Sequence, residues 1–257
     1  GAKYAVACIN GTSALQISLK LVGVKKDDEV IVPSMTFIAP VNAINYNNAK
    51  PIFMDCDEYY TIDVNKTVAF LNEETRTIKK KMSENDLTIT INKKTGNRIT
   101  AIIIVHVFGN AARLNKLVDL CRKKNIALIE DAAESLGSFY EGVHTGRFGS
   151  LSIISFNGNK IITTGGGGMV ITDNKAIADG LKHITTTAKK KHPWLYVHDE
   201  IGFNYRLPNL NAALGCAQME VLPDYVERKR DLANRYAEWF SGRGYEFIRE
   251  PKNSQSN

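Results

Sequence analysis

A glycine followed by two hydroxyl residues stands where a helix is expected to begin. Gly11, Thr12 and Ser13 precede the helical pattern ALQISLKL. Free backbone N–H groups at a helix N-terminus, the positive end of the helix dipole and the two hydroxyls form a pocket suited to a phosphate group. A Ser or Thr at this place more often serves only as a helix cap, so the pattern is weak by itself.

Two neighbouring carboxylates end an apolar, strand-like run. Glu130 and Asp131 close the segment ALIED. Ligands of an open α/β sheet bind at the carboxyl ends of its strands, so a carboxylate placed there can meet a cofactor. A helix-capping role for the aspartate explains the same residues about equally well.

A lone lysine and a run of glycines follow another strand-like segment. Ser155 ends the run LSIIS, Lys160 comes five residues later, and four glycines at 165–168 precede the next strand. Glycine runs cost backbone entropy and are usually kept where something approaches the chain closely. A solvent-exposed lysine beside a flexible loop is the simpler alternative.

The three segments together supply a phosphate cradle, a carboxylate for a ring nitrogen and an amine for an aldehyde. Those are the parts that hold pyridoxal phosphate. A carboxylate beside the pyridine nitrogen keeps it protonated, so the ring can accept the electron pair released when a proton leaves the substrate carbon. The lysine amine binds the aldehyde and can transfer protons. The sequence therefore predicts a pyridoxal phosphate enzyme with Lys160 and Asp131 as catalytic residues.

Strand-like and helix-like segments alternate through most of the chain. The expected strands are residues 29–32, 51–54, 101–105, 127–130, 151–155 and 169–172, and the expected helices are 13–21, 40–46, 64–71, 114–124 and 175–184. Short runs that are apolar at every position, alternating with helices, predict a mostly parallel sheet covered by helices on both faces. The candidate residues would then meet at the carboxyl ends of the strands.

The pattern changes after Pro208. Two successive helices are expected at 210–220 and 225–240, followed by a strand-like GYEFIRE. We therefore predict a cofactor-binding domain over residues 1–220, and over 221–257 an inter-domain helix and the start of a truncated second domain. Earlier in the chain, the polar segment 79–97 is expected to contain a hairpin with its turn at residues 93–97.

The composition and the missing motifs exclude several classes of protein. The 257 residues, 44% hydrophobic and 23% charged, are typical of a globular protein. The motifs GxGxxG after the first strand, GxxxxGK(S/T), GxSxG and HExxH are absent, which disfavours dinucleotide, P-loop, α/β-hydrolase and zinc-protease chemistry. The five histidines show no paired metal-ligand spacing, so no metal site is expected.

The charge and the cysteines indicate where the protein works. The net charge is +6, but the basic clusters 79–81 and 189–191 lie apart and lack regular aromatic interleaving, so we expect no nucleic-acid partner. No apolar run is long enough to span a bilayer. Four scattered cysteines form no CxxC pair and are expected to be buried thiols in a reducing compartment. We therefore expect a cytoplasmic protein without membrane contact.

The order of the motifs resembles a known family. GTSAL, VPSMTFIA, EDAAESLG, SFNGNKIITTGGGG and GFNYRLPNLNAALG follow one another as in the DegT/StrS-type nucleotide-sugar aminotransferases. The resemblance implies the large domain of fold-type I, aspartate aminotransferase-like enzymes, with the small C-terminal domain largely absent from this chain. It also implies pyridoxal phosphate as cofactor and a homodimer with shared active sites. EDAAESLGSFYEGVHTGRFG and the TTGGGG loop look most like the legionaminic acid and bacillosamine branch.

The resemblance also implies a role for each matching residue. Lys160 would bind the cofactor and shuttle the proton, Asp131 would face the pyridine nitrogen, and Glu134 would lie near the ring. The other expected cofactor contacts are Gly11, Thr12, Ser13 and Ser155 at the phosphate, Phe37 stacked on the ring, and Asn204 reaching the phosphate of the neighbouring subunit. His106, Tyr205 and Arg206 are expected on the side of the sugar substrate.

The activity implied is the transfer of the amino group of L-glutamate to the 4-keto carbon of a UDP- or GDP-linked 6-deoxy sugar, for a bacterial surface glycan. A pyridoxal phosphate-dependent sugar dehydratase is an alternative, but such relatives generally carry histidine at the position of Lys160. A non-catalytic fragment of the same fold is a second alternative. A dinucleotide-binding oxidoreductase is a third, disfavoured by the missing glycine fingerprint.

Overall fold

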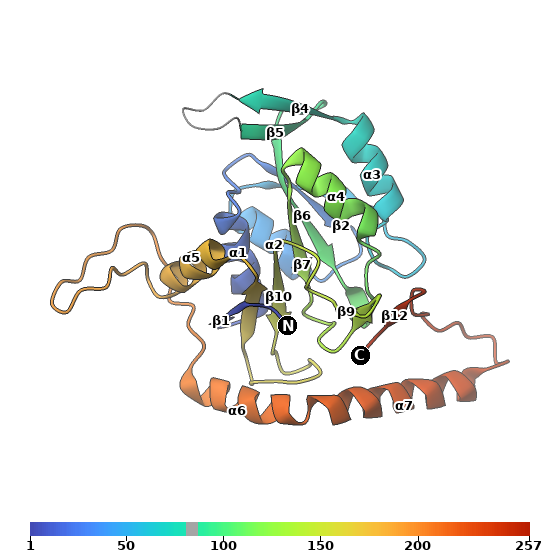
Figure 1. Ribbon diagram of the computed structural model, residues 1–257. Helices are drawn as coiled ribbons and strands as arrows, with labels where there is room; N and C mark the ends of the chain where they lie inside the picture. The colour runs from blue at the N-terminus through green and yellow to red at the C-terminus, as the bar shows by residue number, and fades with distance from the viewer. Residues whose placement is uncertain (81–86) are drawn as a thin grey trace.

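A nine-stranded sheet forms the centre of the computed structural model, which describes residues 1–80 and 87–257 (Figure 1). Its parallel strands, in spatial order, are β3 (Lys50–Met54), β2 (Glu29–Pro33), β6 (Arg98–Val105), β7 (Ala127–Asp131) and β10 (Leu151–Ser155). Antiparallel strands β11 (Gly168–Thr172) and β1 (Tyr4–Cys8) continue the sheet beyond β10. β5 (Leu87–Asn92) and β4 (Thr75–Lys80) add an antiparallel extension at the start of β6.

Helices cover both faces of this sheet. The helices α1 (Gly11–Leu21), α2 (Ile38–Tyr46) and α5 (Lys175–Thr185) pack on one face, and α3 (Val64–Glu73) and α4 (Asn115–Lys124) pack on the other. The alternation of side chains along β6 explains the two cores, because Ile103 faces the first group of helices whereas Ile102 and Ile104 face the second. This confirms the predicted mostly parallel sheet between two helical layers.

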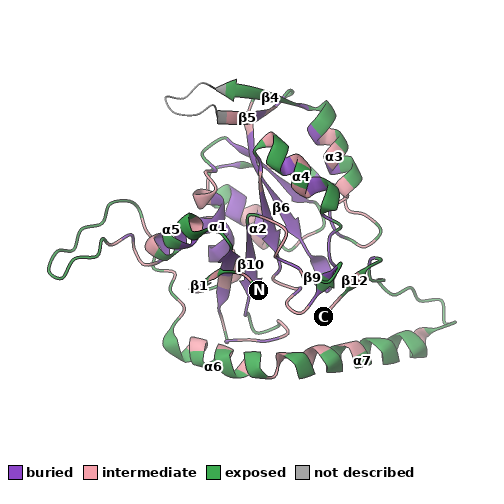
Figure 2. Ribbon diagram, viewed as in Figure 1, coloured by how far each residue is buried: buried purple, intermediate pink, exposed green. Residues whose placement is uncertain are grey.

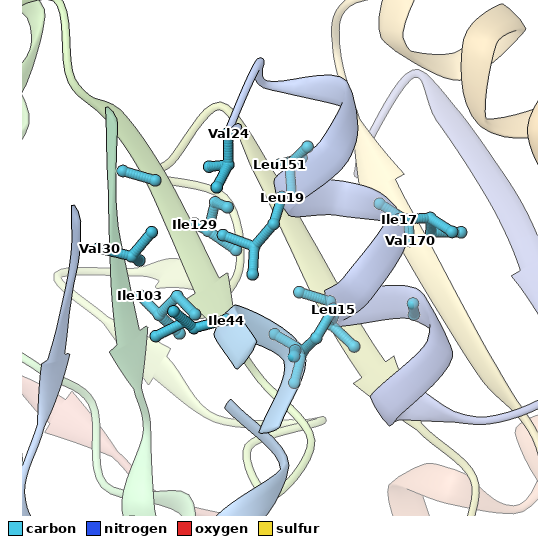
Figure 3. Close-up of a cluster of buried hydrophobic side chains, with 14 of the residues drawn as sticks. Leu15, Ile17, Leu19, Val24, Val30, Ile44, Ile103, Ile129, Leu151 and Val170 are labelled. Carbon is cyan, nitrogen blue, oxygen red and sulfur yellow. The ribbon is translucent and has the colours of Figure 1, made fainter. Parts of the chain in front are cut away.

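The core beneath α1 fixes the helix that carries the expected phosphate site. Figure 3 shows Leu15 and Leu19 of α1 directed toward Val30, Ile103 and Ile129 of the parallel strands. Each such buried aliphatic side chain contributes about 1.5–3 kcal/mol by leaving water. The helix begins at Gly11 rather than Ser13, because the side chain of Asn10 caps it.

The end of the chain has a different environment. The helices α6 (Asn209–Glu220) and α7 (Leu222–Phe240) follow each other along one side of the molecule and contain no buried residue (Figures 1 and 2). The chain then returns to the main body, where β12 (Ser254–Gln255) pairs with β8 (Phe139–Tyr140), which also pairs with β9 (Val143–His144).

Most of the expected elements are present, with shifts at their ends. The hairpin is confirmed, since β5 and β6 pair through Thr90 and Ile99 around residues 93–97. Residues 81–86, which hold one lysine of the first basic cluster and part of the expected hairpin segment, lie outside the described residues. β1 and β4 are additional strands that the sequence did not indicate.

Two expectations are wrong. The segment GYEFIRE forms no strand, because it lies exposed without a neighbouring strand edge that could satisfy its backbone. The cysteines are not all buried: Cys8 and Cys121 are, Cys56 is half-buried, and Cys216 is exposed on α6. Across residues 1–80 and 87–257, no helix combines the length and the apolar character that crossing a membrane requires.

Candidate active site

The candidate residues gather at the carboxyl edge of the parallel sheet. The loops that follow β6, β7 and β10 all leave this edge, and the N-terminus of α1 lies beside the last of them. Gly11 is packed so closely on Ser155 that a Cβ at Gly11 would lie 3.2 Å from the Ser155 Cβ. The structure thus joins the first and third of the segments predicted to bind the cofactor.

Lys160 and Glu134 form an ion pair in a cavity at this edge. The distance from Lys160 Nζ to Glu134 Oε1 is 3.2 Å, and the lysine side chain is 17% exposed. The other carboxylate oxygen of Glu134, Oε2, accepts a hydrogen bond from the backbone N–H of Phe108 at 2.9 Å. The cavity has a volume of about 380 Å³ and is lined by Phe108, Glu134, Asn159, Lys160, Ile161, Lys229 and Asn257. The lysine is therefore accessible from solvent and held by a neighbouring carboxylate.

Asp131, the last residue of β7, is buried. Its Oδ1 accepts a hydrogen bond from the Ala133 backbone N–H at 3.0 Å. Burial raises the pKa of Asp131 to about 6, although the Ala133 hydrogen bond and the positive charge of Lys160 both act to lower it. Asp131 lies three residues before Glu134, the partner of Lys160, so the buried carboxylate and the amine belong to the same edge of the sheet. A cationic ring nitrogen beside Asp131 would stabilise its ionised form.

Glu130 and His106 form a fully buried pair next to Asp131. His106 Nε2 lies 3.0 Å from Glu130 Oε2, and His106 Nδ1 accepts a hydrogen bond from the Ala112 N–H. Because Nδ1 is an acceptor, Nε2 carries the proton and donates it to Glu130. Burial alone would raise the pKa of Glu130, but hydrogen bonds from His106 and from the backbone N–H groups of Gly149 and Gly146 outweigh it and lower this pKa. This contact connects the residue that follows β6 with Glu130, the second-last residue of the neighbouring strand β7.

The predicted phosphate site has a favourable arrangement. Asn10 caps α1 by accepting a hydrogen bond from Ser13 N at 2.7 Å, so this N–H is engaged. The N–H groups of Gly11 and Thr12, at the start of the helix, have no partner within it, and Gly11 packs on Ser155. Thr36, in the loop between β2 and α2, has a buried hydroxyl without a hydrogen-bond partner among the residues described.

Pyridoxal phosphate fits this set of residues. A helix N-terminus packed on Ser155, a buried carboxylate at Asp131 and an accessible amine at Lys160 offer the three partners that the cofactor requires. No grouping of three His, Cys, Asp or Glu side chains suited to a metal ion occurs in residues 1–80 and 87–257.

Other predicted residues lie outside the cavity. Phe37 is the residue before the first turn of α2 and is 73% exposed, so it is not a core residue. Asn204 is exposed and pairs with Thr186 through a β-bridge. The Tyr205 hydroxyl donates a hydrogen bond to Gln16 Oε1 at 3.0 Å.

None of the three expected substrate-side residues lines the cavity. His106 is completely buried with both ring nitrogens engaged, the hydroxyl of Tyr205 is bound to α1, and Arg206 is exposed. Their substrate-binding roles stay predictions.

Five residues of the cavity were not expected from the sequence, of which Asn159 and Ile161 flank Lys160 directly. Phe108 follows the end of β6, has a left-handed backbone with φ 57° and is 53% exposed. Its place after a buried strand was a signal that could have identified it. Lys229 comes from α7 and Asn257 from the last segment of the chain, and no local pattern connects either of them with Lys160.

Comparisons with known proteins agree with this geometry. Residues 1–257 match the DegT/DnrJ/EryC1/StrS aminotransferase family. The chain is 42% identical over 234 residues to the GDP-perosamine synthase of Escherichia coli O157:H7. The alignment covers 91% of this chain and 58% of that protein. It is also 39% identical over 236 residues to EpsN of Bacillus subtilis (strain 168), which is provisionally named a pyridoxal phosphate-dependent aminotransferase. That alignment covers 92% of this chain and 56% of EpsN.

A solved structure gives the same result. The crystal structure of a DegT DnrJ EryC1 StrS aminotransferase from Brucella abortus superposes with a TM-score of 0.86 at 29% identity, covering 100% of this chain and 64% of that one. The chain spans less than two thirds of the length of each of these relatives. Aminotransferases of this family are pyridoxal phosphate-dependent. The family and the fold predicted from the sequence are confirmed: the chain belongs to the DegT/DnrJ/EryC1/StrS aminotransferase family.

Proposed function

We propose that the protein is a pyridoxal phosphate-dependent aminotransferase that moves the amino group of L-glutamate to the 4-keto carbon of a nucleotide-linked 6-deoxy sugar. The observation that carries the proposal is the position of Lys160, accessible in the cavity and paired with Glu134, at the sheet edge where β7 ends in the buried Asp131. An amine that binds an aldehyde and a carboxylate that faces a ring nitrogen are the two groups that this chemistry requires of the protein.

The residues have distinct parts in this proposal. Lys160 binds the cofactor and carries the proton between the cofactor and the sugar carbon. Glu134 orients the lysine amine through the ion pair. Gly11, Thr12, Ser13 and Ser155 hold the phosphate, Phe37 stacks on the ring, and Asp131 keeps the ring nitrogen protonated. When bound, the cofactor supplies the electron sink.

The substrate class is the finer part of the proposal. The similarity to a protein named GDP-perosamine synthase supports a nucleotide-linked sugar as the amino acceptor. We propose a UDP- or GDP-linked 4-keto-6-deoxy sugar from the synthesis of a bacterial surface glycan, of the legionaminic acid or bacillosamine type. The motifs EDAAESLGSFYEGVHTGRFG and TTGGGG support that branch.

We further propose a cytoplasmic homodimer in which Asn204 reaches the phosphate of the neighbouring subunit. All four cysteines are free, as in proteins of a reducing compartment. The loop before Asn204 extends from the body of the molecule and exposes Trp194 and Tyr196 to 82% and 81% (Figure 1). Exposed apolar side chains of this size are typical of a surface that a partner covers.

The division of the chain into residues 1–220 and 221–257 is also proposed. Helix α7 has no buried residue and exposes Leu232, Tyr236 and Trp239, which supports a role as a connection to a second domain. Limited proteolysis followed by mass spectrometry tests this division. Early cleavage close to residue 220 is the expected result, and first cleavage within the sheet would contradict it.

The principal experiment measures cofactor attachment and amino transfer separately. The protein is incubated with pyridoxal phosphate, reduced with borohydride and digested, and the modified peptide is identified by mass spectrometry. We expect the label on Lys160 and none on the Lys160→Arg variant at the same peptide. A panel of UDP- and GDP-linked 4-keto sugars with L-glutamate then tests the acceptor. Absence of any label at Lys160 would end the proposal, whereas a labelled protein that aminates no member of the panel would exclude only the substrate class.

The shared site needs its own measurement. Sedimentation velocity gives the oligomeric state, and mixing Asn204→Ala chains with Lys160→Ala chains tests the sharing of residues. If Asn204 serves the neighbouring subunit, a mixed dimer contains one intact site, and part of the activity returns on mixing. No recovery from a verified mixed dimer would place Asn204 in the site of its own chain.

A further inference from the structure

The last segment of the chain lies against the loop that carries Glu134. The carboxamide Nδ2 of Asn257 donates hydrogen bonds to the carbonyl oxygens of Glu134 and Leu136, at 2.9 and 3.0 Å. The backbone N–H of Asn257 donates to Ser138 Oγ at 3.0 Å. Three hydrogen bonds from one residue thus span the turn that follows β7.

Further contacts hold this segment in place. Ser256 Oγ donates to Asn110 Oδ1 at 2.8 Å, and Arg230 Nε of α7 donates to the carbonyl oxygen of Ser256 at 2.8 Å. Strand β12 pairs with β8 immediately before these residues. Gly109 makes room for the segment, because a Cβ at Gly109 would collide with Oδ1 of Asn257.

Glu134 connects this segment with the active-site lysine. Its side chain binds Lys160 Nζ through Oε1 and the Phe108 N–H through Oε2, while its carbonyl oxygen accepts from Asn257. Within the turn, the Ser135 and Ser138 N–H groups bond to other carbonyls, those of Ala132 and Ser135. The carbonyls of Glu134 and Leu136 therefore depend on the two N–H donors that a carboxamide supplies from one atom.

We infer that Asn257 is a positioning residue: by holding the turn at Glu134 and Leu136, it sets the place of the Glu134 carboxylate relative to the amine of Lys160. The inference deepens the proposed function, because it matters for catalysis only if Lys160 is the cofactor lysine. The physical claim about Lys160 and Glu134 stands without the cofactor. It can therefore be measured on the protein alone.

The test measures how freely the amine of Lys160 reacts. Trace acetylation of the protein without cofactor is quantified at Lys160 by mass spectrometry, relative to the exposed reference Lys123. Glu134→Gln removes the ion pair directly and should raise acetylation of Lys160 by about two- to fivefold, the range expected of a partly exposed pair. Asn257→Ala should raise it in the same direction, because the carboxylate loses its fixed position.

A matched control comes from the same segment. Gln255 is exposed and contributes to β12 through its backbone, so Gln255→Ala should leave the acetylation of Lys160 unchanged. The double variant Asn257→Ala with Glu134→Gln should react no faster than Glu134→Gln alone. Additive effects in the double variant, or an Asn257→Ala protein that reacts like the wild type, would overturn the inference.

Two further readouts separate positioning from folding. Circular dichroism establishes that each variant is folded, and Asn257→Ser, which keeps one short donor, replaces the alanine variant if that protein does not fold. Acetylation of Lys160 in Asn257→Ser should be faster than in the wild type and slower than in Glu134→Gln. Acetylation at the wild-type level would again contradict the inference. Failure of pyridoxal phosphate to attach to Lys160 would refute the proposed function without changing the acetylation results.

Discussion

Gly168 packs directly against Asn10, the residue that caps α1. A Cβ at Gly168 would lie 2.6 Å from the carbonyl carbon of Asn10 and 2.7 Å from the nitrogen of Gly11. The two segments are brought together because β1 and β11 are antiparallel neighbours, with Cys8 opposite Gly168. The glycine run thus permits a close approach, as its composition predicted, and what approaches Gly168 is the backbone of Asn10 and Gly11, beside the predicted phosphate site.

Gly168→Ala should destabilise the protein, whereas Gly166→Ala should not. The added methyl at 168 must push the Asn10–Gly11 peptide away, and overpacking of this kind costs about 1–3 kcal/mol. Gly166 has open space around its Cα and no left-handed backbone, so alanine fits there. Urea unfolding of the two variants checks the prediction. Equal midpoints for both would show that the Gly168 contact is unimportant.

Asp131→Asn should stabilise the protein without cofactor at neutral pH. Burial raises the pKa of Asp131 from 3.8 to about 6, so the folded state keeps a proton that the unfolded state releases. The contribution of Asp131 to stability is therefore fully present below about pH 4, lost as the pH rises to 6, and absent above it. A pKa difference of about 2 corresponds to about 3 kcal/mol.

The measurement is the free energy of unfolding at pH 4, 5 and 8 for both proteins. Because the unfolded-state carboxyl is already partly ionised at pH 4, the difference between Asp131→Asn and wild type should grow in favour of the variant by about 2 kcal/mol between pH 4 and pH 8. Asparagine retains an oxygen for the Ala133 N–H. A difference that stays constant with pH would mean that Asp131 is ionised in the folded protein throughout this range.

Glu130→Gln should be among the most destabilising conservative substitutions. The carboxylate accepts hydrogen bonds from His106, Gly146, Phe148 and Gly149, all at a position without exposure. A glutamine presents an NH₂ group to two of these donors, and breaking a buried pair in this way costs about 3–5 kcal/mol. Chemical unfolding compares it with Glu141→Gln, an exposed change expected to stay within about 0.5 kcal/mol of wild type. A mild effect at Glu130 would contradict the buried network.

Ser155→Ala should weaken the binding of pyridoxal phosphate by about 10-fold, the effect of losing one hydrogen bond to a charged group. Ser152 is the control, because it lies on the same strand but on the opposite face, where its hydroxyl has no hydrogen-bond partner among the residues described. Equilibrium binding followed by absorbance gives both dissociation constants. Equal weakening by the two variants would point to a general effect on β10 rather than a phosphate contact.

The sequence by itself determined the elements and the chemical groups at their ends. Runs such as AIIIV and LSIIS predict buried strands because they contain no charged residue and are mostly apolar, and the parallel strands end at the edge where ligands bind. Asp131 and Lys160 could be selected because both follow such a run. These groups predicted pyridoxal phosphate as the cofactor, and the family motifs implied the same one.

The tertiary structure alone decided which distant residues meet. Periodicity describes a segment's own faces, whereas contacts such as Asn257 with Glu134, or Gly168 with Asn10, depend on the order of strands in the sheet and on the return of the chain after α7. The exposed GYEFIRE segment shows the same limit, since a strand requires a partner edge as well as suitable residues. His106 is the clearest case. Its residue type suited a contact with the substrate, but in the fold it follows β6 and lies in the core, where it contacts Glu130 of β7.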